Sequence, residues 1–331
     1  MIVAGGLLLA GLSCIAVGHT MGGHAYLSDG DSRLVATTLT PEGDFDSISL
    51  ETLSADVTLL YAEDGICRVE ARDQEGVEYT AKVEDGVLTV HAEDTRQWYE
   101  HIVSSGEPTL TVYLPAQSYK SLSASVTTGD VTVGRDFTFS GSVAISVTTG
   151  DLTLSASVER STALSATTGD IRVEGTHKVL AASVTTGRVT VQSSAVESLS
   201  IKSGSGSVTI QDLTAEGAVR VEITTGSQSL LRVTCGELDL HAGTGDVTLT
   251  DTVAAGQLQA KTTTGDVTFV RSDAATLFVK TNTGDVAGSL LTPKIFAPDT
   301  TSGSIDVPKS TEGGLCEIKT TSGSICITLE E

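Results

Sequence analysis

Six aspartates form the set of residues in this chain that most resembles a chemical site. Each ends a Thr-Gly-Asp tripeptide, and the tripeptides fall into two runs of nearly constant spacing. The aspartates are Asp130, Asp151 and Asp170 in the first run and Asp246, Asp266 and Asp285 in the second. If the spacing stacks them about 5 Å apart, each carboxylate makes its neighbours harder to ionise. A bridging Ca²⁺ would relieve this repulsion, because calcium prefers oxygen ligands.

The same aspartates have a second interpretation as solvated residues of tight turns. Arg188 interrupts the first run. Serine takes the equivalent position in four further copies, at Ser207, Ser227, Ser304 and Ser324. The spacing also differs from the short repeat of calcium-binding β-rolls. The sequence leaves both interpretations open, a weak calcium ladder or structural turn residues, and predicts no other cofactor.

The sequence contains no other pattern that indicates catalysis. The histidines are scattered and match neither HExxH nor a metal-ligand spacing; they are His19, His24, His91, His101, His177 and His241. The glycine-rich turns lack the lysine and the following helix of a phosphate loop. Polysaccharide-cleaving β-helices build their clefts from long inserted loops, for which the regular spacing leaves no room. We therefore predict that the protein is not an enzyme.

The elements that carry these aspartates come from an internal repeat. A turn glycine recurs eleven times at intervals of 18 to 21 residues, at Gly129, Gly150, Gly169, Gly187, Gly206, Gly226, Gly245, Gly265, Gly284, Gly303 and Gly323. Thr or Ser always precedes it, and a tight corner between strands often needs the positive φ that glycine accepts. A repeat of this length indicates a stacked architecture.

Aliphatic residues keep fixed distances from the turn glycine. They stand two and four places after it and five places before it, with a few exceptions such as Gln228. These positions alternate with polar ones, which is the period of a strand with one buried face. We predict an all-β fold, a parallel β-solenoid of about eleven coils of 19–20 residues over residues 117–331. Residues 25–116 are expected to form an N-terminal β capping region, with a hairpin at Asp85-Gly86.

The N-terminal segment, residues 1–24, has no charged side chain and is almost wholly apolar or small. With its flanks it is long enough for a membrane-spanning helix, which we predict as an anchor. A cleaved signal peptide is the alternative, although the usual basic start is missing. Lipid attachment at Cys14 fits the sequence less well. The strongly acidic sequence that follows favours an extracytoplasmic body.

The charge of the chain restricts its partners. The formal net charge is −22. Residues 25–116 hold 19 acidic and 5 basic side chains, a net of −14, and residues 117–331 hold 23 and 15, a net of −8. This surface would repel phosphate backbones, so no nucleic-acid partner is expected. The five cysteines show no CxxC, and Cys316 and Cys326 fall on opposite faces, so we predict no bridge between them.

The stretch "VYLPAQSYKSLSASVTTGDVTV", the repeated (T/S)(T/S)G(D/S)(I/V) turns and the hydrophobic N-terminus together resemble the bacterial putative adhesin domain family. The resemblance covers about Asp44 to Glu331. It implies a β-solenoid with an adhesive or envelope role, and it supplies neither catalytic residues nor an established activity.

These observations predict a membrane-anchored, non-enzymatic cell-surface protein that binds a surface or envelope ligand through a rigid acidic solenoid. The alternative is an envelope sensor or scaffold that binds one protein partner or assembles end to end. In the register of the glycine repeat, the segment "ICITLEE" forms the last coil, and its side chains offer little bulk to cover the end of the stack. Solenoids need covered ends, so self-association through the ends is also expected.

Overall fold

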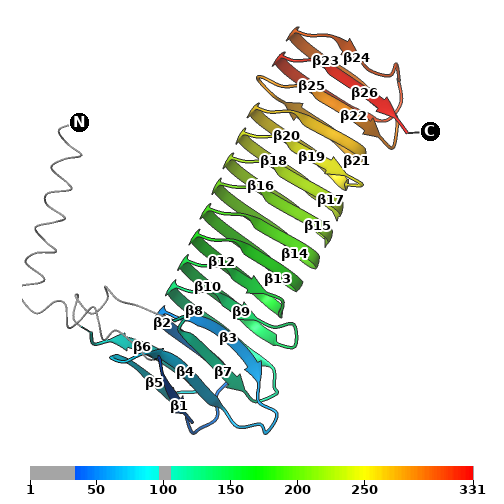
Figure 1. The fold of residues 1–331 in the computed structure, drawn as a ribbon. Helices are drawn as coiled ribbons and strands as arrows, with labels where there is room; N and C mark the ends of the chain where they lie inside the picture. Colours follow the sequence, from blue (N-terminus) through cyan, green and yellow to red (C-terminus); the bar gives the residue numbers. More distant parts are fainter. Residues whose placement is uncertain (1–33, 97–105, 331) are drawn as a thin grey trace, which may run out of the picture.

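The computed structural model describes residues 34–96 and 106–330, and every element in these ranges is a β-strand. The strands form one continuous sheet that winds into an elongated stack of coils (Figure 1). The predicted all-β solenoid is therefore confirmed. The predicted N-terminal helix at residues 1–24 lies outside the described residues. Within them, no helix has the length and apolar character needed to cross a membrane.

The central coils repeat one arrangement, in which strands on either side of a turn glycine stack in parallel on their counterparts. Leu152, for example, pairs with Val131 of one neighbouring coil and Ile171 of the other. This is the register that the sequence columns predict. The strands are β8 (Tyr119–Thr128), β9 (Val131–Val133), β10 (Thr138–Thr149), β11 (Leu152–Leu154), β12 (Ser157–Thr168), β13 (Ile171–Thr186), β14 (Val189–Ser205), β15 (Val208–Ala215), β16 (Ala218–Thr225), β17 (Gln228–Cys235), β18 (Glu237–Thr244), β19 (Val247–Thr250), β20 (Val253–Thr264) and β21 (Val267–Lys280).

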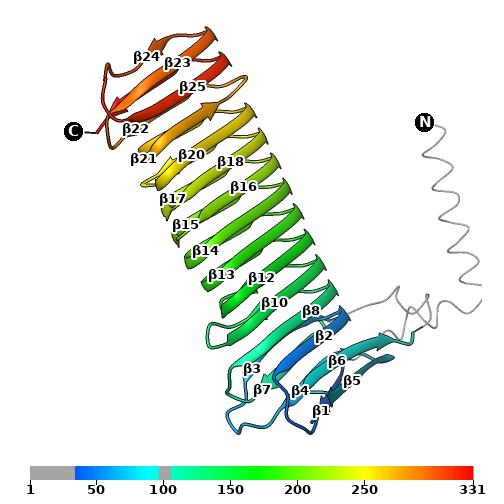
Figure 2. The ribbon, with the colours of Figure 1, turned by 180° about the vertical axis from the view of Figure 1, so that it is seen from behind.

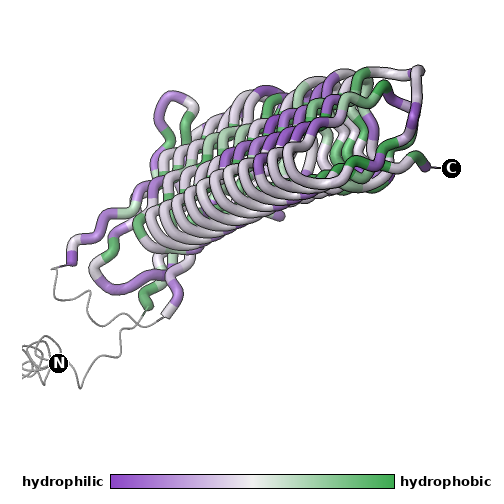
Figure 3. Tube along the Cα trace, turned by 90° about the horizontal axis from the view of Figure 1, so that it is seen from above, coloured by the Kyte–Doolittle hydropathy of each residue, from purple (hydrophilic) through white to green (hydrophobic). Residues whose placement is uncertain are grey.

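The aliphatic columns form the core, and the residues between them face outward. Val131 and Val133 are buried, while Thr132 between them is exposed. Gln228, which interrupts a column, is also buried, and its Nε2 donates a hydrogen bond to the His241 carbonyl oxygen at 2.7 Å. Seen from above, the coils superpose along the stack, with hydrophilic and hydrophobic residues in rows (Figure 3).

Two structural constraints, a positive φ and close stacking of the coils, require glycine at the turn positions. All eleven have positive φ, as the sequence predicts. In addition, each packs closely on its neighbour: a Cβ on Gly206 would lie 1.9 Å from the carbonyl oxygen of Gly187. A side chain at this corner would therefore push the coils apart, in addition to the strain of the positive φ.

The N-terminal strands do not stack in sequence order. They are β1 (Leu34–Leu39), β2 (Ser47–Ser54), β3 (Asp56–Tyr61), β4 (Arg68–Gln74), β5 (Val77–Glu84), β6 (Val87–Asp94) and β7 (Thr109–Leu114). The coil β2–β3 lies between β6–β7 and β8–β9, since Ile48 pairs with both Leu88 and Leu122. Part of the region predicted as a cap is thus a coil in register with the repeats.

Antiparallel strands cover the outer side of the coil β6–β7. β5 pairs with β6 through a hairpin at Asp85-Gly86, where both residues have positive φ, and this confirms the predicted turn. β4 pairs with β7, and β1 pairs with β4. This end of the described solenoid is therefore extended by strands of the opposite direction (Figure 2).

The C-terminal strands also depart from sequence order. They are β22 (Val286–Leu290), β23 (Lys294–Ser302), β24 (Ile305–Asp306), β25 (Gly314–Ser322) and β26 (Ile325–Leu329). β25 pairs with β21 and β23, and β26 pairs with β22 and β24. The expectation that the "ICITLEE" segment forms the last coil is wrong, because the coil β23–β24 lies outside it.

Two local features fit this inserted arrangement. Gly314 opens β25, and a Cβ there would lie 1.8 Å from the Ala275 carbonyl oxygen. The buried Lys294 reaches across β25 to the buried Asp273, with Nζ 2.6 Å from Oδ1. A buried ion pair of this kind fixes which segments meet, since neither charge is stable there without the other.

Candidate functional site

The turn aspartates lie in the two predicted rows, and each uses one carboxylate oxygen to hold the next coil. The backbone N–H of Asp151 donates to Asp130 Oδ1 at 2.7 Å. The same bond recurs from Asp170 N–H to Asp151, from Arg188 N–H to Asp170, from Asp266 N–H to Asp246, from Asp285 N–H to Asp266 and from Ser324 N–H to Asp285, at 2.6 to 2.9 Å. The rows therefore act as a hydrogen-bond ladder along the corner.

Sequence reasoning missed the first rung of this ladder. The N–H of Asp130 donates to Asp56 Oδ1 at 2.8 Å. Asp56 sits in "SADV", which matches the later turn motif except that Ala55 replaces glycine. Ala55 does not have the positive φ of the later turn glycines, so the alanine is tolerated. A motif search that allowed alanine at the turn position would have found it.

The ladder explains the aspartates without a metal. Across residues 34–96 and 106–330, no group of three or more His, Cys, Asp or Glu side chains is arranged to hold a metal ion. A carboxylate that already accepts a backbone N–H keeps one oxygen for water or a cation. The calcium hypothesis for Asp130, Asp151, Asp170, Asp246, Asp266 and Asp285 stays a prediction.

The described histidines lie far apart in three different settings. His177 is buried, with Nδ1 3.0 Å from Thr162 Oγ1 and Nε2 3.1 Å from the Glu174 carbonyl oxygen. Burial lowers the pKa of His177, because the charged imidazolium is poorly solvated there. His241 pairs with Asp239 at 2.9 Å and His91 with Glu51 at 3.2 Å. These contacts fit structural roles.

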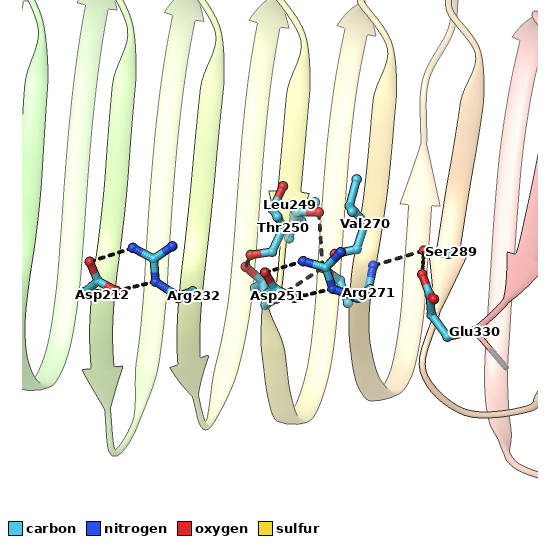
Figure 4. Close-up of polar contacts among 11 residues, drawn as sticks. Asp212, Arg232, Leu249, Thr250, Asp251, Val270, Arg271, Ser289 and Glu330 are labelled. Carbon is cyan, nitrogen blue, oxygen red and sulfur yellow. Dashed lines mark hydrogen bonds and ion pairs between the residues drawn. The ribbon is translucent and has the colours of Figure 1, made fainter.

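A second ladder follows another corner of the solenoid (Figure 4). Arg232 binds Asp212 through two hydrogen bonds of 2.5 and 2.8 Å, and Arg271 binds Asp251 through two of 2.7 and 2.6 Å. Hydrogen bonding to the guanidinium lowers the pKa of Asp212 and of Asp251. Each pair ties one coil to the next.

All four residues of this second ladder have left-handed backbone, with φ from 47° to 54°, which is unfavourable for arginine. Sequence reasoning missed them, although each stands six places after a turn glycine. The sequence signal that could have identified them is the column six places after the turn glycine, where Asp212, Arg232, Asp251 and Arg271 alternate in charge.

The family now follows from the comparisons. A family model described as Toastrack DUF4097 matches residues 45–182 and again residues 176–328. The chain belongs to the Toastrack family. The relationship predicted from the turn motifs is therefore confirmed, and the double match reflects the repeat. No curated protein matches this chain in sequence.

Solved structures similar to this Toastrack chain share little sequence with it. A putative lipid binding protein from Parabacteroides distasonis has 13% identity and a TM-score of 0.39, covering 88% of this chain and 98% of its own. Putative adhesins from Bacteroides fragilis and Parabacteroides merdae have 13% identity and TM-scores of 0.35 and 0.38, covering 90% of this chain and 98% of their own. At such values they carry no argument about function.

The outer faces of this Toastrack chain are flat and differ along its length. A shallow groove crosses several coils and is lined by small side chains, among them Ser123, Ala144 and Ala163. Farther along, Lys261, Lys280 and Lys319 stack in register on β20, β21 and β25. Carboxylates partly balance this row, because Lys319 pairs with Glu317 and Asp299 follows it in register on β23.

Proposed function

We propose that this Toastrack chain is a non-enzymatic surface protein that is anchored by its N-terminal segment and presents its solenoid outside the membrane as an adhesin. The observation that carries the proposal is the use of the turn carboxylates. Their Oδ1 atoms accept backbone N–H groups from the next coil, which makes them part of the scaffold rather than an acid–base pair. Family membership agrees with this role.

The outer faces support extended contact with a ligand instead of a deep pocket. Short hydroxyl and methyl side chains cover most of the groove, and none of its lining residues is aromatic, so the groove offers no ring on which a sugar could stack. Contacts of this kind are individually weak, and their sum depends on many coils engaging at once. A rigid rod with repeated faces suits such multivalent binding.

Protease accessibility tests the placement. The full chain, tagged at its C-terminus, is exposed to a protease on intact cells, on cells stripped of wall or outer membrane, and after lysis. We expect cleavage before lysis. Protection that persists after the outer layers are removed and ends only with lysis would contradict the proposal.

Adhesion is tested with the full chain displayed on beads and offered to cells and to wall material. Ala163→Arg places a bulky charge on the small-residue face, and Thr132→Arg places the same charge on another exposed position. We expect Ala163→Arg to reduce bead retention more than Thr132→Arg does. Equal retention of all three proteins, or no retention of the parent chain, would count against adhesion through this face.

The alternative is a scaffold that associates through its ends, and one observation favours it. The coil β23–β24 leaves core residues open to solvent, whereas antiparallel strands cover the opposite end of the described solenoid. A scaffold of this kind forms stoichiometric assemblies without a foreign ligand.

A further inference from the structure

The coil β23–β24 ends the stack without a cover among the described residues. β23 pairs only with β25 and β24 only with β26, which leaves the outer edges of both strands free. In Figure 2 this coil forms the tip of the stack, remote from the strands β1, β4 and β5. An uncovered last coil presents to solvent the side chains that every other coil buries.

Ile305 shows this exposure most clearly. It belongs to the column two places after the turn glycine, where Ile325 and Val286 in the neighbouring coils are 0% exposed. Ile305 itself is 47% exposed. Phe296 and Val307 are partly buried at the same end and pack against the core. Ile295 and Leu315 are also exposed and lie opposite each other, but on the outer side of the strands, so they face away from the open end of the core.

We refer to Phe296, Ile305 and Val307, which lie on the core side of the terminal coil, as the tip patch. Scattered exposed apolar residues are ordinary, but a contiguous apolar surface bounded by polar residues usually marks an interface. The tip patch is contiguous because it is the open end of the core, and a partner is needed to cover it.

Charge favours a second copy as that partner. The whole chain has a net charge of −22, but residues 294–309 hold only two Asp and two Lys, and Lys294 is buried with Asp273, so the terminal coil carries little net charge. Charges farther away are screened over about 8 Å at physiological ionic strength. Two tips can therefore approach each other with little repulsion, whereas contacts between the strongly acidic regions at residues 25–116 would be opposed.

The two ends of the solenoid determine how two copies can meet. A head-to-tail contact needs a second open coil, and β5 and β4 cover the coil β6–β7. Among the described residues, the surface that matches a tip is therefore another tip, in an isologous contact that closes at two copies. The contact is apolar packing of one tip patch on the other.

We propose that the tip patch packs against the tip patch of a second copy and forms a head-to-head dimer whose N-terminal regions point in opposite directions. A specific interface takes about 20–30 residues from each side, and the terminal coil with its flanking loops can contribute about that number. If the chain is anchored as in the proposed function, the dimer joins two opposing surfaces. Only this bridging role, and not the dimer itself, rests on the proposed function. The adhesive contact would then be homophilic.

Association is measured first, by analytical ultracentrifugation of the full chain in detergent micelles over a concentration series. Ile305→Lys introduces a charge into the tip patch at a position that already faces solvent. Leu53→Lys is the matched control, since Leu53 is similarly exposed but lies on β2, near the other end. We expect a monomer–dimer equilibrium for the parent chain and for Leu53→Lys, and at least tenfold weaker association for Ile305→Lys.

Orientation is measured by pulsed distance measurements between spin labels. Cys14 and Cys326 are replaced by serine, and the three buried thiols are unreactive because burial raises the pKa of Cys67 and Cys235 to about 11 and that of Cys316 to about 12. One label is placed at Asp306→Cys and, in a separate protein, one at Thr132→Cys, which holds the same column position ten coils away. At about 4.8 Å per coil, a head-to-head dimer separates the two labels at residue 132 by about 100 Å.

The two labels at residue 306 should then lie within about 40 Å, roughly the width of a coil. Short distances at residue 132, dimerisation unaffected by Ile305→Lys, or a parent chain that stays monomeric at every concentration would each overturn the proposal. If the protein pairs in this way but is protected from protease in stripped cells, the dimer stands and only its bridging role fails.

Discussion

Replacing Gly206 by alanine should weaken the solenoid by more than a backbone preference alone would explain. Gly206 has φ of 137°, a region that side-chain-bearing residues avoid at a cost of about 2 kcal/mol. Its Cβ would also lie 1.9 Å from the Gly187 carbonyl oxygen, so the coils must separate. Two backbone hydrogen bonds at this corner, from Gly206 N–H to Thr225 and from Gly187 N–H to Ser205, are 2.9 Å long. Weakening both adds about 1 kcal/mol each, for a total of about 4 kcal/mol.

Two further glycines separate the two causes. Gly65 has φ of 71° with nothing within 4 Å of an added Cβ, so Gly65→Ala carries only the backbone strain, about 1 kcal/mol. Gly134 has neither a positive φ nor a neighbour within 4 Å, so Gly134→Ala should leave stability unchanged or slightly raise it.

Native-state hydrogen exchange is the suitable assay, because the coils of a repeat protein can open separately and a single unfolding transition would average over them. We expect the opening free energy of the amides around Gly206 to fall by about 4 kcal/mol, with a smaller loss in distant coils. If Gly206→Ala costs no more than Gly65→Ala, close stacking of the turn is not what requires glycine there.

Three other substitutions follow from contacts in the fold. Asp151→Ala removes the acceptor of the Asp170 N–H and should cost about 1 kcal/mol, while Asp151→Asn keeps an acceptor and should cost less; thermal unfolding compares them. A melting temperature that rises with added Ca²⁺ in the parent chain but not in Asp151→Ala would favour the calcium ladder over the turn interpretation. Burial lowers the pKa of His177, so the fold favours its neutral form, and the protein should lose stability as pH falls below about 6.5. Urea titrations at several pH values measure this loss, which should be smaller in His177→Gln. Lys294→Met leaves the buried Asp273 without its partner and should cost about 3 kcal/mol or more, whereas the double variant Lys294→Met with Asp273→Leu should recover most of it. If the costs of the two single substitutions simply add in the double variant, the ion-pair explanation is wrong.

The repeat was predictable because its cause is local. The glycine spacing, the aliphatic columns and the hairpin at Asp85-Gly86 each follow from backbone conformation or strand period, and the structure has them in the predicted register. The free thiols Cys316 and Cys326 likewise lie on opposite faces, one buried and one exposed.

The order of the coils at the two ends was not predictable from period alone. The strand β25 matches the repeat pattern equally well inside or outside β23, and the choice depends on long-range contacts such as Lys294 with Asp273. The Asp–Arg ladder was missed for a different reason. Its residues sit in left-handed turns where composition gives no strand signal, so only the fixed distance from the turn glycine could have identified them.

The inserted position of β25 and β26 has a consequence for how the chain folds as it is made. The tip coil β23–β24 leaves the ribosome or the export channel before the strands that support it, and β25 and β26 are its only strand partners in the described structure. Earlier coils can add one after another onto a finished template, but the tip must wait for the following segment to enter beneath it. A chain that stopped after residue 313 would lack β25 and β26, and the coil β23–β24 would then have no strands to pair with. Two coils rather than one would therefore be missing from the end of the solenoid.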